Sequence, residues 1–166
     1  QVLDSLVRLG GFADPPLDPI VPARSQYGYR NKLEYSFSHD EGRLTLGFHR
    51  AGRWDEIIDL EACHLTTDLG NGVRDAVKAW ALEEKLEPYD QETQTGYLRH
   101  LVVREGRNTG EALVMLVTGP GEKFDPDYLI ETVRRFPEVK SLHWAINDAV
   151  AEVTNLPTRV LWGQEW

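Results

Sequence analysis

The sequence predicts an α+β domain in which a mostly antiparallel sheet, built from two β-hairpins, carries helices on one face. Apolar and polar residues alternate in two pairs of short runs, and turn residues separate the members of each pair. A run with helical spacing follows each pair. Because hairpins dominate over strand–helix–strand crossovers, we expect the order ββ(β)αββαβ.

The first hairpin is the clearest of these elements. Every second residue from 33 to 37 is apolar, and the alternation returns from 44 to 48 after an Asp-Glu-Gly turn at 40–42. This period of two predicts strands with one buried face. A third, shorter strand is expected at 57–60.

The later elements follow from helical spacing and from turn residues. Thr66 or Thr67 is expected to cap a helix whose apolar residues share one face, and Pro88 lies beyond its end. The remaining strands and the second helix are predicted at residues 98–104, 111–118, 127–136 (the helix), 139–146 and 159–162.

Residues 1–23 have a different character. Apolar residues recur at helical spacing between positions 2 and 9, and two glycines follow directly. Four prolines between residues 15 and 22 favour an extended connector. We therefore predict a helix and connector over 1–23 and the α+β domain over 24–166.

Composition narrows the class of protein. The chain has 166 residues, of which 41% are hydrophobic and 27% charged, as in ordinary globular domains. The apolar runs are shorter than the roughly 20 residues of a membrane span, so we expect no membrane partner. A single cysteine indicates a reducing, cytoplasmic setting. The start at Gln1 and the abrupt end suggest a piece of a larger protein.

Recognisable catalytic patterns are missing from the sequence. Gly119-Pro120-Gly121 lacks the Lys-Ser/Thr that completes a phosphate-binding loop. Cys63 and His64 are adjacent in an extended segment, so their side chains should point to opposite faces rather than act together. The other four histidines lack metal-ligand spacing. We expect no catalytic residue in this chain.

Charge is distributed unevenly along the chain, although the net charge is −9. Residues 24–53 carry six basic side chains against three acidic ones, whereas residues 54–96 carry three against eleven. Arginine suits phosphate oxygens, and exposed aromatic rings suit unstacked bases. Two interpretations remain open from the residues alone: an RNA-binding surface, or a hairpin rim with solubilising arginines.

The basic residues are expected to meet at one end of the first hairpin, because the two ends of an antiparallel pair lie side by side. Trp54 follows them and adds an aromatic ring. The candidate RNA-binding residues are Tyr29, Arg30, Asn31, Lys32, His49, Arg50 and Arg53, with Arg99 and Arg104 of the second hairpin in second rank.

Several strings resemble the central domain of the RNA uracil-5 methyltransferases. Their order and spacing match over nearly the whole chain. The strings are YRNKLEYSF (29–37), LGFHRAG (46–52), IDLEACHL (58–65), GYLRHLVVR (96–104), TGEALV (109–114) and LWG (161–163).

The resemblance implies a parent enzyme that transfers a methyl group from S-adenosylmethionine to C5 of a uracil in tRNA or rRNA. It also implies that the catalytic residues and the methyl-donor site belong to a Rossmann-like domain absent from this chain, so the chain alone should be inactive. The alternative is a non-enzymatic module that binds protein or RNA.

The same resemblance assigns a position to Cys63. In many members it is the last of four cysteines that hold a [4Fe–4S] cluster, and the other three precede the position of Gln1. One thiolate cannot hold such a cluster. We therefore expect Cys63 to be metal-free here.

Overall fold

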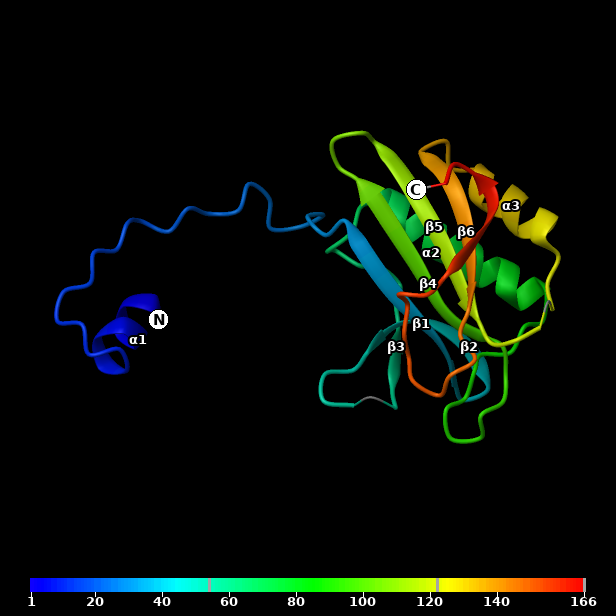
Figure 1. The fold of residues 1–166 in the computed structure, drawn as a ribbon, viewed down its shortest axis with the longest axis horizontal. Helices are drawn as coiled ribbons and strands as arrows, with labels where there is room; N and C mark the ends of the chain where they lie inside the picture. The colour runs from blue at the N-terminus through cyan, green and yellow to red at the C-terminus, as the bar shows by residue number, and fades with distance from the viewer. Residues whose placement is uncertain (54, 122, 166) are drawn as a thin grey trace.

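A computed structural model describes residues 1–53, 55–121 and 123–165. Seven strands form one sheet in the order β3-β2-β1-β4-β5-β6-β7 (Figure 1). The strands are β1 (Lys32–Asp40), β2 (Arg43–His49), β3 (Ile57–Asp59), β4 (Leu98–Gly106), β5 (Glu111–Thr118), β6 (Val139–Ile146) and β7 (Thr158–Gly163). The helices are α1 (Val2–Arg8), α2 (Asp68–Glu83) and α3 (Pro126–Arg134).

The two predicted hairpins, β1–β2 and β4–β5, are confirmed, and they join through an antiparallel pairing of β1 with β4. The sheet is mostly antiparallel, as predicted. One pair differs: β5 and β6 run parallel, with α3 as their crossover. The hairpin-based reading of the sequence overlooked this crossover, because periodicity identifies strands but says nothing of their direction.

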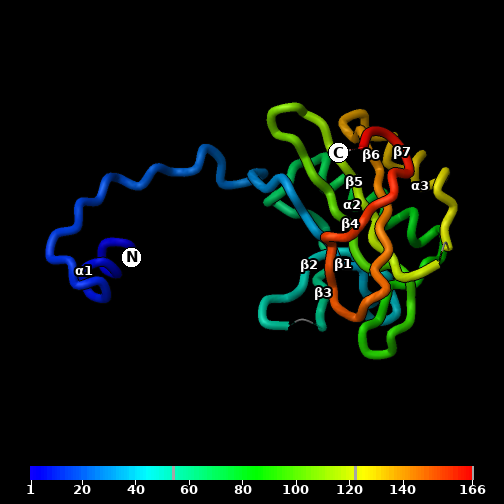
Figure 2. Tube along the Cα trace, viewed as in Figure 1, coloured from blue at the N-terminus to red at the C-terminus, as the bar shows by residue number. Residues whose placement is uncertain are grey.

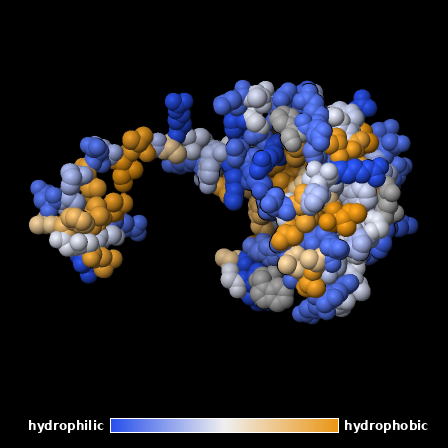
Figure 3. All heavy atoms as spheres, viewed as in Figure 1, coloured by the Kyte–Doolittle hydropathy of each residue, from blue (hydrophilic) through white to orange (hydrophobic). Residues whose placement is uncertain are grey.

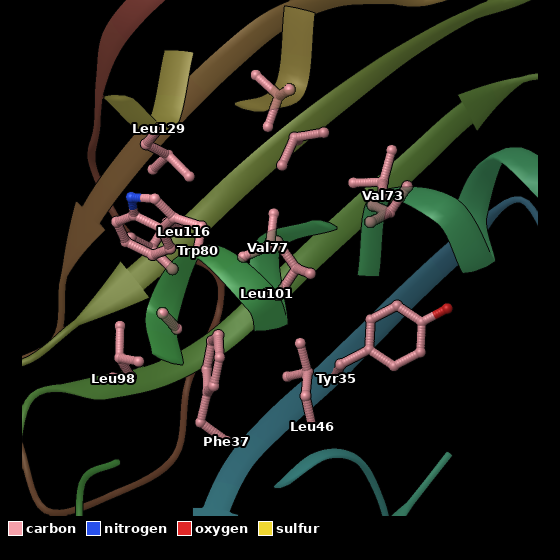
Figure 4. Packing of buried hydrophobic residues seen from close by; sticks show 14 of the residues in the cluster. Tyr35, Phe37, Leu46, Val73, Val77, Trp80, Leu98, Leu101, Leu116 and Leu129 are labelled. Carbon is pink, nitrogen blue, oxygen red and sulfur yellow. The ribbon is translucent and has the colours of Figure 1, made fainter. Parts of the chain in front are cut away.

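Helices α2 and α3 pack on one face of the sheet. Trp80 of α2 points toward Leu116 and Leu129, which come from β5 and α3 (Figure 4). The Trp80 ring also meets the edge of Phe124 at 5.5 Å between centroids. Thr67 begins α2, because its hydroxyl accepts a hydrogen bond from the Gly70 amide.

The other face of the sheet is partly covered by the segment between β6 and β7, which we call the strap (residues 147–157). It crosses in front of the sheet in Figure 1 before β7 returns alongside β6. Leu156 of the strap packs against a small second cluster that includes Met115 and Val117. None of the helices in the described part of the chain is long and apolar enough to cross a membrane.

The first 23 residues extend away from this body. Figures 1 and 2 show α1 well separated from the sheet, at the end of an extended connector. Helix α1 has seven residues, and none of them is buried. The predicted helix and the predicted connector are thus both present.

Candidate nucleic-acid interface

The start of β1 and the end of β4 bring two cationic side chains together. Lys32 is the direct partner of Arg104 in the antiparallel pairing. Their neighbours Leu33 and Val103 are buried in the core beneath α2. Since successive residues of a strand point to opposite faces, Lys32 and Arg104 extend from the face opposite the helices, and both are exposed.

The backbone of the segment before β1 is held on two sides, by the backbone of residues 64–65 and by the Arg107 side chain, although it lies outside any strand. The amides of Gly28 and Arg30 each donate a 2.8 Å hydrogen bond, to the carbonyls of His64 and Leu65. From the other side, the Arg107 guanidinium donates to the carbonyls of Gly28 and Arg30 at 2.6 and 2.8 Å. The Arg30 side chain therefore extends from a fixed backbone.

Two tyrosines accompany Arg30 at the surface. Tyr29 is 60% exposed and Tyr27 is 66% exposed. The Tyr27 ring meets His64 edge-on, with 5.8 Å between centroids. The sequence analysis missed Tyr27 and Arg107; the Tyr-Gly-Tyr-Arg string was a signal for Tyr27, whereas the anchoring role of Arg107 depends on a partner 77 residues away.

We call Tyr29, Arg30, Asn31, Lys32 and Arg104 the junction surface, because they lie where the two hairpins meet. A hollow of about 470 Å³ opens there, lined by Asn31, Lys32 and Arg104 together with Glu105, Gly106, Glu111 and Leu113. Figure 3 shows strongly hydrophilic side chains gathered over the start of β1.

Glu34 partly neutralises the positive charge of the junction surface. Its carboxylate forms an ion pair with Lys32. Partial burial works to raise the pKa of Glu34, but Lys32, Thr154 and His100 together outweigh it and hold this pKa below its ordinary value. No side-chain partner of Arg30 or Arg104 is found among the described residues, so these two guanidinium groups face solvent.

Arg50 and Arg53 form a second group in the β2–β3 loop, which joins β2 at His49 to β3 at Ile57. Arg50 bonds to Glu56, and Arg53 forms a two-pronged contact with Asp55 at 2.8 and 2.9 Å. The Arg53 guanidinium lowers the pKa of Asp55 to about 2. Trp54 lies outside the described residues.

The structure keeps this loop apart from the junction surface, contrary to the expectation that both ends of the hairpin lie side by side. Residues 32–36 of β1 pair with β4, and the pairing of β2 with β1 is recorded only as far as Gly47. Beyond Gly47, β2 follows β3 instead. His49 Nε2 remains 3.4 Å from Ser36 Oγ, while the loop lies at the lower left of the sheet-and-helix body in Figure 1.

Arg99 differs from the other candidate residues, because it is only 2% exposed. Its guanidinium donates to the strap carbonyls of Asn147, Ala149 and Val150 and to the Glu152 carboxylate, at 2.5–3.0 Å. It also lies 4.1 Å above the Tyr89 ring. In this structure Arg99 fastens the strap rather than facing solvent.

The Glu152 carboxylate of the strap receives hydrogen bonds from several of these residues. Burial works to raise its pKa, but hydrogen bonds from His100, Arg99 and Gln91 dominate and lower it to about 2. His100 is in turn bonded to Ser36. These contacts line a second hollow of about 320 Å³, which also contains Asp55, Asp90 and Glu92. His39, His49 and Arg99 line it as well, so its lining mixes acidic and basic side chains.

Cys63 is buried in the connection between β3 and α2, whereas its neighbour His64 is exposed. The backbone amide and carbonyl of Cys63 are both bonded to the Asn71 side chain. Tyr35 lies beside it, and burial raises the pKa of the Tyr35 phenol above its ordinary value.

These surroundings do not fit an iron–sulfur cluster. Within the described residues, no group of three or more His, Cys, Asp or Glu side chains is arranged to hold a metal ion. Cys63 is the single cysteine of this sequence, whereas a [4Fe–4S] cluster requires four cysteine thiolates.

The crossover from β5 to β6 leads through Gly119-Pro120-Gly121, where the Tyr97 hydroxyl donates to the Gly121 carbonyl at 2.9 Å. Neither hollow described above touches this turn.

Comparison with known proteins provides the family. No family model matches the chain. An uncharacterized RNA methyltransferase of Bacillus cereus is 33% identical over 100% of this chain and 36% of its own length. The tRNA (uracil(54)-C(5))-methyltransferase of Pyrococcus horikoshii is 27% identical over 89% of this chain and 34% of its own.

A solved structure agrees with these relatives. The Pyrococcus abyssi tRNA (uracil-54, C5)-methyltransferase, in complex with S-adenosyl-L-homocysteine, matches 87% of this chain with a TM-score of 0.72 and 27% identity. The match covers 34% of that structure, and the chain spans about a third of the length of its relatives. By sequence and by fold, the chain corresponds to one part, about a third in length, of proteins of the RNA uracil-C5 methyltransferase family.

Proposed function

We propose that this chain is the RNA-contacting domain of an S-adenosylmethionine-dependent RNA uracil-C5 methyltransferase. The names of its relatives support the reaction, and the part of those relatives outside the match would supply the methyl-donor site and the catalytic groups. The role left to this chain is to hold the RNA. We expect the isolated chain to be inactive.

The observation that carries the proposal is the pairing of Lys32 with Arg104. Like charges directly opposite each other across a sheet destabilise it. A polyanion bound at that place would turn the repulsion into attraction, and its phosphates would suit the Arg30 and Arg104 guanidinium groups. In a chain with a net charge of −9, such a local basic surface favours a specific contact over general adhesion.

The junction surface also suits unpaired RNA. Methylation of a base at C5 requires the base to leave its stack. The exposed rings of Tyr27 and Tyr29 offer faces on which a splayed base can stack, beside an arginine for the adjoining phosphate. The β2–β3 loop would extend the contact, after its arginines exchange Asp55 and Glu56 for phosphates.

The test uses the full-length protein and tRNA or rRNA transcripts, with affinity measured at several salt concentrations. Replacing both Arg30 and Arg104 by alanine should reduce the slope of log affinity against log salt by about 1.4–1.8, since each lost phosphate contact changes it by about 0.7–0.9. Arg43→Ala with Arg135→Ala is the matched control, because it removes two exposed arginines elsewhere.

An unchanged slope in the Arg30/Arg104 variant would refute the junction surface. The reaction itself is tested separately, by transfer of a labelled methyl group from S-adenosylmethionine to uracil in the same transcripts. Absence of transfer to every uracil-containing RNA would refute the enzymatic part of the proposal. Comparison of the two kinds of transcript decides between tRNA and rRNA.

A further inference from the structure

The hollow of about 320 Å³ beside the strap, which we call the strap hollow, has the size of a small-ligand site. Ligand pockets enclose about 300–1,000 Å³, so this one is matched to a single small ring system. Its lining comes chiefly from β1, β2 and β4, from the loop between α2 and β4 (residues 84–97), and from the strap. Figure 1 shows that loop and the strap meeting at the lower end of the sheet.

The strap hollow belongs to the same face of the sheet as the junction surface. Ser36 pairs with His100, four residues along from the pair of Lys32 with Arg104, and residues separated by an even number point to one face. At roughly 3.3 Å per residue, the two pairs lie about 13 Å apart along β1. An RNA strand held at the junction surface therefore has its neighbouring nucleotides within reach of the hollow.

The outer wall of the strap hollow is held in shape by its own hydrogen bonds. The Asp90 amide donates to the Thr95 carbonyl at 2.7 Å, and the Thr93 amide donates to the Asp90 carboxylate at 2.8 Å. Gln91 ties this loop to the strap by donating to the Glu152 carboxylate at 2.9 Å. The wall is thus formed without a ligand, as in most small-molecule sites.

Two carboxylates of the lining have no cationic partner. The charges of Arg99 and Glu152 offset each other at 3.0 Å, and Asp55 is held by an arginine of the β2–β3 loop. Asp90 and Glu92 are exposed, and the described residues form no ion pair with either of them. The hollow therefore offers hydrogen-bond acceptors to a ligand that carries N–H donors.

The same lining contains a spare donor and flat rings. Arg99 Nε is buried and has no hydrogen-bond partner within the described chain, which leaves one donor without an acceptor. The exposed rings of His39 and His49 also line the hollow, and imidazole faces can stack on unpaired bases. Acceptors, a donor and flat rings around a small volume are what a single nucleobase requires.

We propose that the strap hollow binds an unpaired nucleobase that carries an exocyclic amino group, from a nucleotide near the target uridine. This inference rests on the proposed function, which brings RNA to this face. Cytosine, adenine and guanine each have an amino group that donates to carboxylates such as Asp90 and Glu92, whereas uracil has only carbonyl oxygens in its place. The hollow would thus reject the uridine to be methylated and hold its neighbour, which fixes the register of the strand.

The test titrates the nucleosides cytidine, adenosine and uridine into the 166-residue chain and follows the histidine ring signals by NMR. Cytidine and adenosine should shift the signals of His39 and His49, with dissociation constants about tenfold lower than that of uridine. Asp90→Ser with Glu92→Met should remove this preference. The serine hydroxyl can still accept from the Thr93 amide, so the loop keeps its turn.

The matched control is Glu131→Met with Glu138→Ser, which removes two exposed carboxylates from α3 and the turn after it and should keep the preference. Equal affinity for the three nucleosides, or a preference that survives in the Asp90/Glu92 variant, would overturn the proposal. So would ring shifts caused by inorganic phosphate or by spermidine but by none of the nucleosides, since the hollow would then bind an ion.

The result is independent of the junction surface, because nucleosides carry no phosphate. If the nucleosides fail to bind while the junction-surface variant still changes the salt slope, the strap hollow alone is refuted. If they bind as expected while that slope stays unchanged, the proposed phosphate contacts are refuted and the base site stands.

Discussion

Lys32 of β1 and Arg104 of β4 are direct partners in the sheet, so two cations extend side by side from the face that the helices leave open. At the other end of the same hairpin, Arg43 is opposite Asp40, an attractive pair. The chain thus contains a repulsive and an attractive cross-strand pair on one strand. Only the repulsive pair lies on the junction surface.

Arg104→Gln should therefore stabilise the free chain while weakening its contact with RNA. Loss of the repulsion from Lys32 should raise the free energy of unfolding by about 0.5 kcal/mol, as measured by urea denaturation. Arg43→Gln is the control, because it removes an attraction and should lower the same free energy by a similar amount. Equal destabilisation by both substitutions would contradict the role given to the Lys32–Arg104 pair.

Arg99 is expected to matter for stability rather than for RNA. Arg99→Met should lower the free energy of unfolding by about 3–5 kcal/mol, because it leaves the Glu152 carboxylate and several strap carbonyls without their donor. Arg99→Lys should restore little of this loss, since an ammonium cannot reproduce the guanidinium fork. Hydrogen exchange should accelerate in the strap first.

RNA binding provides the second readout for Arg99. At a temperature where Arg99→Lys is folded, the salt slope of RNA affinity should equal that of the unaltered protein. A slope reduced by about 1 would show that Arg99 contacts phosphate after all.

Glu152 should make the free energy of unfolding depend on pH in the acidic range. Its folded-state pKa is lowered to about 2 from an ordinary value of 4.5, so its contribution is complete above about pH 4.5 and is lost as the pH falls toward 2. Glu152→Gln should cost about 2 kcal/mol at pH 7. The difference between the two proteins should shrink steadily below pH 4.5, as followed by urea denaturation across that range.

A stability difference that stays constant from pH 7 to pH 3 would contradict this account of Glu152. Asp148→Asn serves as the matched control. It removes a carboxylate from the same strap and leaves Glu152 in place, so the stability of this variant should still fall as the pH drops from 4.5 toward 2.

Cys63 should behave as a buried thiol without metal in this chain. Reconstitution with iron and sulfide should produce no visible cluster absorption, and Cys63→Ala should give the same result. The thiol should react slowly with a disulfide reagent in the folded chain and rapidly in urea, because it is 7% exposed. Stoichiometric iron bound by the 166-residue chain would contradict the prediction.

Side-chain patterns predicted most of the local structure. The alternation around Leu33, Tyr35 and Phe37 and the repeat from Leu69 to Trp80 each report which side of an element is buried, and that information is local. The strand predicted at 139–146 agrees with β6, and the tail strand predicted at 159–162 lies within β7 (Thr158–Gly163). The strings that resemble the RNA uracil-5 methyltransferases could likewise be recognised from the sequence alone.

The site was less predictable, for a physical reason. Arg99 and Arg104 carry the same charge, yet Arg99 is buried under the strap whereas Arg104 faces solvent. That difference depends on a bulge between Leu98 and His100 and on carbonyls about 50 residues away. No local pattern encodes such contacts.

By itself, then, the sequence determined which stretches form strands and helices, to within a few residues, and that one stretch is rich in cations. The tertiary structure decided that β1 pairs with β4, that the β2–β3 loop leaves the basic cluster, and that Lys32 meets Arg104. The reason is the range of the forces. Periodicity reflects each element's own solvation, whereas the pairing of strands some seventy residues apart depends on how all the buried faces fit together at once.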